Sequence, residues 1–239
     1  PSDPELSLLL ASESAAVGYT TQGEEALRQS LLQTHAYGDL TAKDPSSLTG
    51  TASARPREVH FSPDNRYVLG VFDCLDVIWR IEPRALIAEM DLTHFVQDES
   101  GYGWSCSPSN VAAFSPSGRL ILSSYTDGAR GYASEVWETA SGHRIAAFEP
   151  AGDVYGAAFS HDEEFVVTAE GTYAGAGWGM ARVWRISTGE LVRQLQDPAR
   201  ERIEGASFSP DDRWLLTMGS RGTARVWDWR EGISLSAFN

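Results

Sequence analysis

One pattern recurs four times from residue 57 onward, and it constrains the fold more than any other feature of the chain. Each copy opens with a small or β-branched residue two positions before a phenylalanine, which is followed by Ser and in three copies by Ser-Pro. An apolar pair follows seven and eight residues later, and a tryptophan preceded by Ile or Val comes next. The phenylalanines are Phe61, Phe114, Phe159 and Phe208, and the tryptophans are Trp79, Trp137, Trp184 and Trp227.

This pattern predicts a four-stranded antiparallel sheet in each copy. The phenylalanine ends a first strand, and the Ser-Pro-Asp sequence is turn chemistry, because Pro fixes φ and Asp or Ser bonds nearby backbone. The apolar pair lies in a second strand, and the tryptophan is a large wedge on a third. One sheet cannot bury both of its faces, so the sheets must stack. The predicted outer strands are Ala85–Met90, Arg144–Phe148, Leu191–Leu195 and Ser234–Phe238.

The F-S-P-D…V-W pattern at four positions resembles the WD-repeat β-propeller family over residues 57–239. The resemblance implies an all-β fold of four propeller blades at about 57–90, 110–148, 154–195 and 204–238. The family's Gly-His pair is absent, and Arg221 replaces the usual aspartate before the last tryptophan. We therefore do not expect the His–Asp–Ser–Trp network that ties such blades together. Propellers have four to eight blades, and this family usually has about seven. We therefore expect an open ring completed by a missing C-terminal portion, another chain or a second copy; a compact closed ring of four blades is the alternative.

Residues 1–34 lack the repeat pattern, and their leucines at helical spacing predict a short helical hairpin. Ser2 with Glu5 and Thr21 with Glu24 each fit a capping box before leucines at helical spacing. Residues 35–56 are rich in Ser, Thr, Gly, Pro and Ala and predict a linker. Residues 3–32 resemble the connector that precedes propellers in bacterial STAND-type signalling NTPases. That resemblance implies a sensor propeller in a cytoplasmic signalling protein, with the nucleotide switch on another domain, since this chain holds no G-x-x-x-x-G-K-[ST] loop.

Charge and composition narrow the function. A formal net charge of −14 argues against nucleic acid as a partner, because phosphates would be repelled. No stretch approaches the length of a membrane-spanning helix. Cys74 and Cys106 lie far apart and suggest neither a disulfide framework nor a zinc site, so an intracellular compartment is the default.

No motif supplies catalytic chemistry, a metal or a cofactor. H-E-x-x-H and G-x-S-x-G are absent, and the glycines of residues 175–179 lie between the second and third predicted strands, where a loop is expected. The carboxylate pairs Glu163–Glu164 and Asp211–Asp212 lie on predicted turns, and we interpret them as solvated charge. We therefore predict a recognition module rather than an enzyme. A propeller enzyme and a purely architectural scaffold stay open as alternatives, because propellers host many functions.

Three insertions relative to the minimal repeat predict the working surface. They are residues 91–110 between the first two blades and residues 127–133 and 170–179 between second and third strands. In the family resembled, these two classes of connection emerge on one face. Aromatic and Arg side chains dominate binding hot spots, and loops on rigid scaffolds carry binding. The predicted protein-binding residues are Tyr102, Trp104, Asp127, Arg130, Tyr132, Glu170, Tyr173 and Trp178.

Overall fold

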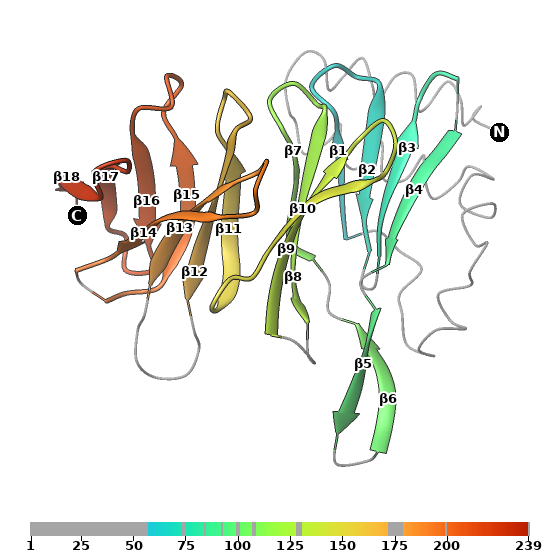
Figure 1. The fold of residues 1–239 in the computed structure, drawn as a ribbon, viewed down its shortest axis with the longest axis horizontal. Helices are drawn as coiled ribbons and strands as arrows, with labels where there is room; N and C mark the ends of the chain where they lie inside the picture. The colour runs from blue at the N-terminus through green and yellow to red at the C-terminus, as the bar shows by residue number, and fades with distance from the viewer. Residues whose placement is uncertain are drawn as a thin grey trace. The chain divides into compact units, whose positions relative to one another are not determined.

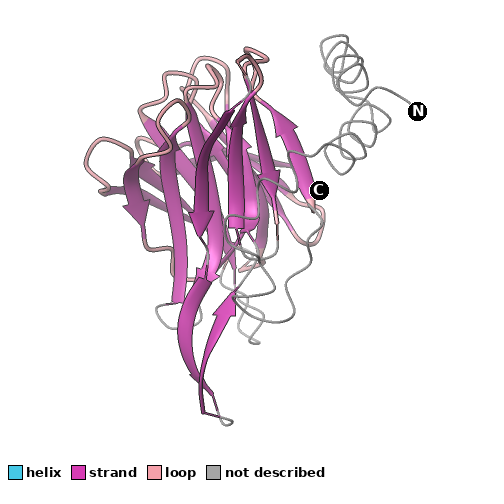
Figure 2. Ribbon diagram, turned by 90° about the vertical axis from the view of Figure 1, so that its right-hand side faces the viewer, coloured by secondary structure: helices cyan, strands magenta, loops and turns pink. Residues whose placement is uncertain are grey.

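The structure is a computed structural model that describes residues 57–72, 75–83, 85–91, 93–98, 101–106, 109–127, 131–171, 179–198 and 200–238. Within the ranges 91–110 and 126–127, it describes the backbone of these residues but not their side chains. The predicted helical hairpin and linker, residues 1–56, lie outside this part. All regular elements that it contains are strands (Figure 2). No helix that could cross a membrane occurs in the described residues.

Four antiparallel sheets of four strands each, blades 1 to 4, confirm the predicted architecture (Figure 1). Blade 1 contains β1 (Glu58–Phe61), β2 (Tyr67–Val71), β3 (Leu75–Arg80) and β4 (Ala85–Asp91). Blade 2 contains β7 (Ser109–Phe114), β8 (Leu120–Asp127), β9 (Gly131–Glu138) and β10 (Arg144–Phe148). Blade 3 contains β11 (Asp153–Phe159), β12 (Phe165–Gly171), β13 (Met180–Arg185) and β14 (Leu191–Gln196). Blade 4 contains β15 (Ile203–Phe208), β16 (Leu215–Gly219), β17 (Ala224–Asp228) and β18 (Ile233–Phe238).

The connection between blades 1 and 2 is more ordered than the predicted loop. It holds a two-stranded hairpin of β5 (Thr93–Asp98) and β6 (Gly101–Cys106), with Phe95 paired to Trp104 and Gln97 to Tyr102. Phe95 and β-branched residues on β5 and aromatic residues on β6 favour extended backbone, and the polar residues between the strands suit a turn. The described residues therefore contain a second kind of sheet, which arises from its own local pattern.

The turn after each first strand follows the predicted chemistry. In blade 3, the Ser160 hydroxyl donates to Asp162 Oδ1 at 2.6 Å and accepts the Phe165 N–H at 2.9 Å. The fourth residue after the phenylalanine has a positive φ in all four blades, at Asn65, Gly118, Glu163 and Asp212. One left-handed residue thus closes every turn, and a local Ser–Asp bond accompanies it in blades 1, 3 and 4.

The chain divides into two compact units. Unit 1 consists of residues 1–109 with 139–142, and its described part holds blade 1 around Phe61, Val68 and Trp79. Unit 2 consists of residues 110–138 and 143–239.

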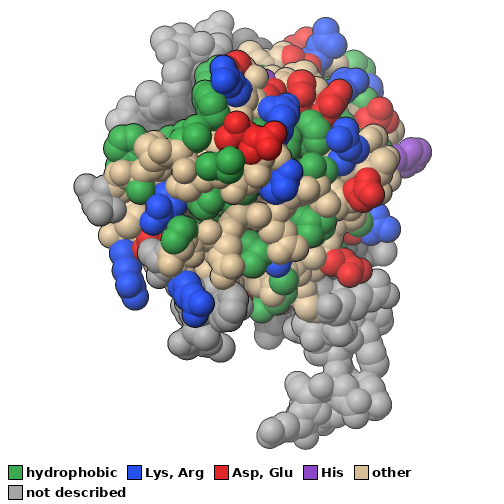
Figure 3. Space-filling view, turned by 60° about the vertical axis from the view of Figure 1, so that its left-hand side comes forward, with side chains coloured by type: hydrophobic (Ala, Val, Ile, Leu, Met, Phe, Trp, Pro, Cys, Tyr) green, Lys and Arg blue, Asp and Glu red, His purple; other side chains and the backbone are tan. Residues whose placement is uncertain are grey.

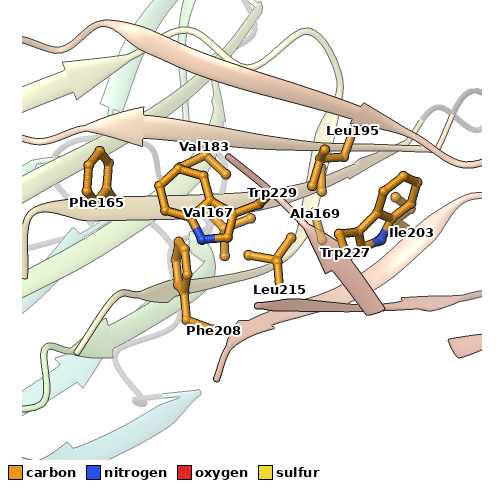
Figure 4. Packing of buried hydrophobic residues seen from close by; sticks show 11 residues of the cluster. Phe165, Val167, Ala169, Val183, Leu195, Ile203, Phe208, Leu215, Trp227 and Trp229 are labelled. Atoms are coloured by element: carbon orange, nitrogen blue, oxygen red, sulfur yellow. The ribbon is translucent and has the colours of Figure 1, made fainter. Parts of the chain in front are cut away.

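Two buried clusters join the three sheets of unit 2. Between blades 2 and 3, Trp184 stacks on Phe148 with 5.4 Å between ring centroids. Between blades 3 and 4, Trp229 lies edge-on against Phe165 and Phe208 (Figure 4). The predicted tryptophan wedge is therefore confirmed within unit 2, and a second tryptophan, two residues after Trp227, adds to it.

Candidate functional site

The structure describes side chains for only two of the eight predicted binding residues. Arg130, Tyr173 and Trp178 lie outside the described residues, and Tyr102, Trp104 and Asp127 are described by backbone alone. In the register of the β5–β6 hairpin, Tyr102 and Trp104 are two residues apart, so both positions fall on one face of the hairpin.

Tyr132 lies near the tip of a long hairpin. Strands β8 and β9 are 8 residues each, against 5 each for β16 and β17. The extra length pairs Thr126 with Tyr132 and Asp127 with Gly131, whose φ of 107° suits glycine. Tyr132 is half-buried. The register therefore brings Asp127 and Tyr132 to the same end of blade 2.

Glu170 requires a correction to the predicted binding surface. Glu170 is only 2% exposed, and its carboxylate bonds groups inside the protein. Oε1 accepts the Thr168 hydroxyl at 2.6 Å, while Oε2 accepts the Ala151 N–H at 2.9 Å and forms an ion pair with Arg182. Thr168 and Glu170 are two residues apart on β12, so they share a face that points into the molecule. We therefore leave Glu170 out of the binding surface.

Glu170 belongs to a buried polar network of blade 3 that differs from the His–Asp–Ser–Trp network of the resembled family. The Trp184 Nε1–H donates to Thr168 Oγ1 at 3.0 Å, and Thr168 in turn donates to Glu170. Arg182, two residues before Trp184, closes the network by donating to Glu170. The tryptophan–hydroxyl bond of the resembled family is thus present in blade 3, but a Glu–Arg pair takes the place of its other members. Burial raises the pKa of Glu170 above its ordinary value, and the bonds from Thr168 and Arg182 only partly oppose this.

Blade 4 repeats half of this arrangement. The Trp227 Nε1–H donates to Thr217 Oγ1 at 2.9 Å, and Arg225 donates to the buried Asp197 at 3.0 Å. Blade 1 has Gly70 at the threonine position, where a Cβ would lie 2.6 Å from the Trp79 ring. The tryptophan of blade 1 therefore packs directly on backbone, without the hydroxyl bond.

Two turn carboxylates, Glu163 and Asp212, join neighbouring blades. Asp212 accepts the His161 N–H at 2.8 Å and the Asp162 N–H at 2.9 Å. Glu163 accepts the Ser117 N–H at 2.9 Å and is held by Arg119 at 3.2 Å. The interpretation of these two carboxylates as solvated charge was therefore wrong. Each has the positive φ of its turn, which directs its side chain onto the turn of the preceding blade.

Hydrogen bonding sets the ionisation of Glu163. Burial by itself would raise its pKa, but bonds from Ser117, Ser115 and Arg119 outweigh burial, and the pKa lies below its ordinary value. Glu163 is therefore ionised at neutral pH.

Replacing Asp212 with Asn tests the role of the turn carboxylates. Asn tolerates the left-handed backbone, but its NH2 group would face one of the two donated N–H groups. We expect Asp212→Asn to lower the free energy of unfolding by about 1–3 kcal/mol. Urea denaturation followed by circular dichroism measures this loss. The matched control, Asp211→Asn, changes an exposed neighbour whose bonds from Ser209 Oγ and the Arg213 N–H both go to Oδ1, and the Asn oxygen can accept the same bonds. The control should therefore cost clearly less than Asp212→Asn, and equal losses for the two would contradict the assignment.

Several buried carboxylates in the described part of the chain bond structural groups of the blades. No cluster of three or more His, Cys, Asp or Glu that could hold a metal ion occurs among the described residues. Three of the buried carboxylates, Glu170, Asp197 and Asp212, bond groups of their own or the adjacent blade. Sequence reasoning missed Arg182 and Arg225, although the sequence A-R-V-W occurs at both 181–184 and 224–227 and signals a shared role.

Comparison with known proteins adds to this geometry. The family model described as WD domain, G-beta repeat, matches residues 189–228, which run from the end of blade 3 through the tryptophan strand of blade 4. A protein of Danio rerio, "WD repeat, SAM and U-box domain-containing protein 1", is 38% identical over 47 residues. The match covers 20% of this chain and only 10% of that protein. The matched family residues do not include residues 3–32, so they give the proposed connector no support. The chain therefore carries a WD40 repeat at residues 189–228, within an array of four antiparallel four-stranded blades.

Proposed function

We propose that this chain is a non-catalytic recognition module that binds a protein partner through its inserted connections. WD40 repeats generally serve as protein-interaction scaffolds, and the chain carries one. The observation that supports the proposal best is the long β8–β9 hairpin with Tyr132 near its tip. None of the described side chains of its extra residue pairs belongs to the hydrophobic cluster between blades 2 and 3.

The proposal also covers the larger protein to which this module belongs and the compartment in which it works. We infer a sensor portion of a larger bacterial signalling protein in the cytoplasm, from the resemblance of residues 3–32 to the connectors of such proteins. The surface would consist of Tyr102, Trp104, Asp127, Arg130, Tyr132, Tyr173 and Trp178. Aromatic side chains are favoured there because they bury much area at little entropic cost.

A triple variant tests the proposed surface. We expect Trp104→Ala, Tyr132→Ala and Trp178→Ala together to abolish capture of the native partner while the midpoint of thermal unfolding changes by a few degrees at most. Quantitative proximity labelling in the source cells compares the variant with the unchanged chain.

The control for this test changes a short turn that is not part of the proposed surface. Thr188→Ala with Glu190→Ala changes the exposed turn between β13 and β14 and should leave the captured proteins unchanged. Unfolding of the triple variant would show that these aromatics are core residues, and the proposal would fall. Equal capture by all three chains would equally count against it.

A further inference from the structure

One face of blade 4 is more exposed than the equivalent faces of blades 2 and 3, where every equivalent position is buried. We call this the terminal face; on it Leu216, Met218 and Phe238 are exposed, and Trp214, Ala224 and Val226 are half-buried. Hydrophobic side chains lie among charged ones on the side of unit 2 that carries β18 (Figure 3). Isolated exposed apolar residues are ordinary, but a set that shares one face of one sheet is a mark of an interaction site.

The equivalent positions of blade 2 are covered by blade 3. Leu122, at the position of Leu216, is fully buried, whereas Leu216 is 38% exposed. Phe148 and Phe238 both lie eleven residues after the blade's tryptophan, yet Phe148 is 2% exposed and Phe238 58%. The covered Phe148 is the residue that stacks on Trp184 of the next blade.

The terminal face copies the blade 2 face in its residue types as well as its position. Three apolar residues are identical between the two faces: Leu122 and Leu216, Val136 and Val226, and Phe148 and Phe238. Five residues after the first-strand phenylalanine, Arg119 in blade 2 and Arg213 in blade 4 are also identical. Arg119 is the side chain that donates a hydrogen bond to Glu163 of blade 3, the blade that covers blade 2.

We propose that the terminal face docks a WD-type blade other than blades 1 to 4. The occupant would present a tryptophan on its third strand to stack on Phe238, as Trp184 stacks on Phe148. An acidic residue four positions after its first-strand phenylalanine would pair with Arg213, as Glu163 pairs with Arg119. Continuity with the interface between blades 2 and 3 carries the proposal, and it is independent of the proposed loop surface.

A second copy of this chain fits the terminal face less well. In blades 3 and 4, the side chains that could cover another blade already pack on the preceding one. Blade 1 would therefore have to dock, through Phe61 and Trp79, the equivalents of Phe159 and Trp184, but both are already buried. At the position of Glu163, blade 1 has Asn65, which carries no charge for Arg213. The sequence of the occupant is therefore expected to be closer to blade 3 than to blade 1.

The test appends blade 3 to the end of the chain. Residues 1–238 are followed directly by a second copy of residues 149–196, so that the native junction after Phe148 is reproduced after Phe238. Hydrogen exchange read by mass spectrometry compares β16 to β18 with and without the appended copy. We expect exchange in β18 to slow about tenfold or more, because docking removes its local opening. Leu216→Asp, or Arg213→Glu with Phe238→Ala, should abolish that protection.

Leu235→Asp is the matched control. Leu235 is as exposed as Met218, but its counterpart in blade 2, Ile145, stays 48% exposed although blade 3 covers that blade. The control should therefore keep the protection. Unchanged exchange in β18, an appended copy that stays sensitive to protease, or equal effects of Leu216→Asp and Leu235→Asp would overturn the proposal. Protection of β18 that rises with concentration in the chain without the appended copy would assign the face to a second copy instead.

Discussion

Replacing Trp229 with Ala is expected to lower the free energy of unfolding by about 3–5 kcal/mol. Trp229 is 1% exposed, and its ring lies 5.1 Å from Phe165 and 5.7 Å from Phe208 between ring centroids. Its Nε1–H donates to the Asp212 carbonyl at 3.0 Å, so the indole joins the cluster between blades 3 and 4 to the turn that carries Asp212. The loss is large because the cavity opens between two packed sheets, which would have to move toward one another to close it.

Urea denaturation followed by far-ultraviolet circular dichroism measures this loss without relying on tryptophan fluorescence. Trp229→Phe keeps the ring but not the Nε1–H bond, and it should cost less than Trp229→Ala. Trp214→Ala is the matched control, since Trp214 is only half-buried and should cost about 1 kcal/mol or less. Similar losses for Trp214→Ala and Trp229→Ala would show that the cluster between the blades is not where the stability resides.

Removing one member of the buried Glu170–Arg182 pair is the second large expected effect. Arg182→Met leaves the Glu170 carboxylate buried without its cation, and we expect a loss of about 3–5 kcal/mol near neutral pH. The double variant Arg182→Met with Glu170→Gln removes both charges but keeps an oxygen that can accept the Thr168 hydroxyl or the Ala151 N–H, and it should recover much of that loss. Thermal or urea unfolding of the single and double variants gives the coupling between the two residues.

The pH dependence of this loss identifies Glu170 as its cause. Burial raises the pKa of Glu170 above its ordinary value of 4.5, so the folded state binds this proton more tightly than the unfolded state does. The stability gained by protonation is fully present below 4.5 and is lost as the pH rises through the folded pKa. Without Arg182 the folded pKa should rise further, so the loss caused by Arg182→Met should be smaller at pH 5 than at pH 8.

Two control variants test whether the buried carboxylate of Glu170 causes the loss. Arg66→Met removes an exposed arginine whose Nε lies 3.8 Å from Asp64, and it should cost about 1 kcal/mol or less at either pH. The double variant should show no extra dependence on pH over the same range. A loss from Arg182→Met that is the same at pH 5 and pH 8 would exclude the buried carboxylate as its source.

The sequence was sufficient to predict the four sheets because their signals are local. Each first strand ends in a phenylalanine, and each Ser–Asp turn closes through bonds within six residues, as at Ser160, Asp162 and Phe165. The hairpin of β5 and β6 was missed because its pattern is not part of the repeat. The candidate binding residues stay a prediction, with the exception of Glu170, which the network of blade 3 holds inside the sheet.

Only the tertiary structure decided which carboxylates and which apolar residues are buried. Asp211 and Asp212 are identical in type and adjacent, yet Asp212 bonds backbone 50 residues away because its φ is positive and blade 3 lies beside it. Phe148 and Phe238 hold equivalent positions in their blades, and they differ in burial because blade 3 covers the first and no described sheet covers the second. A repeat in the sequence determines what each blade is, whereas the neighbour that packs against a blade determines which of its side chains are core and which are surface.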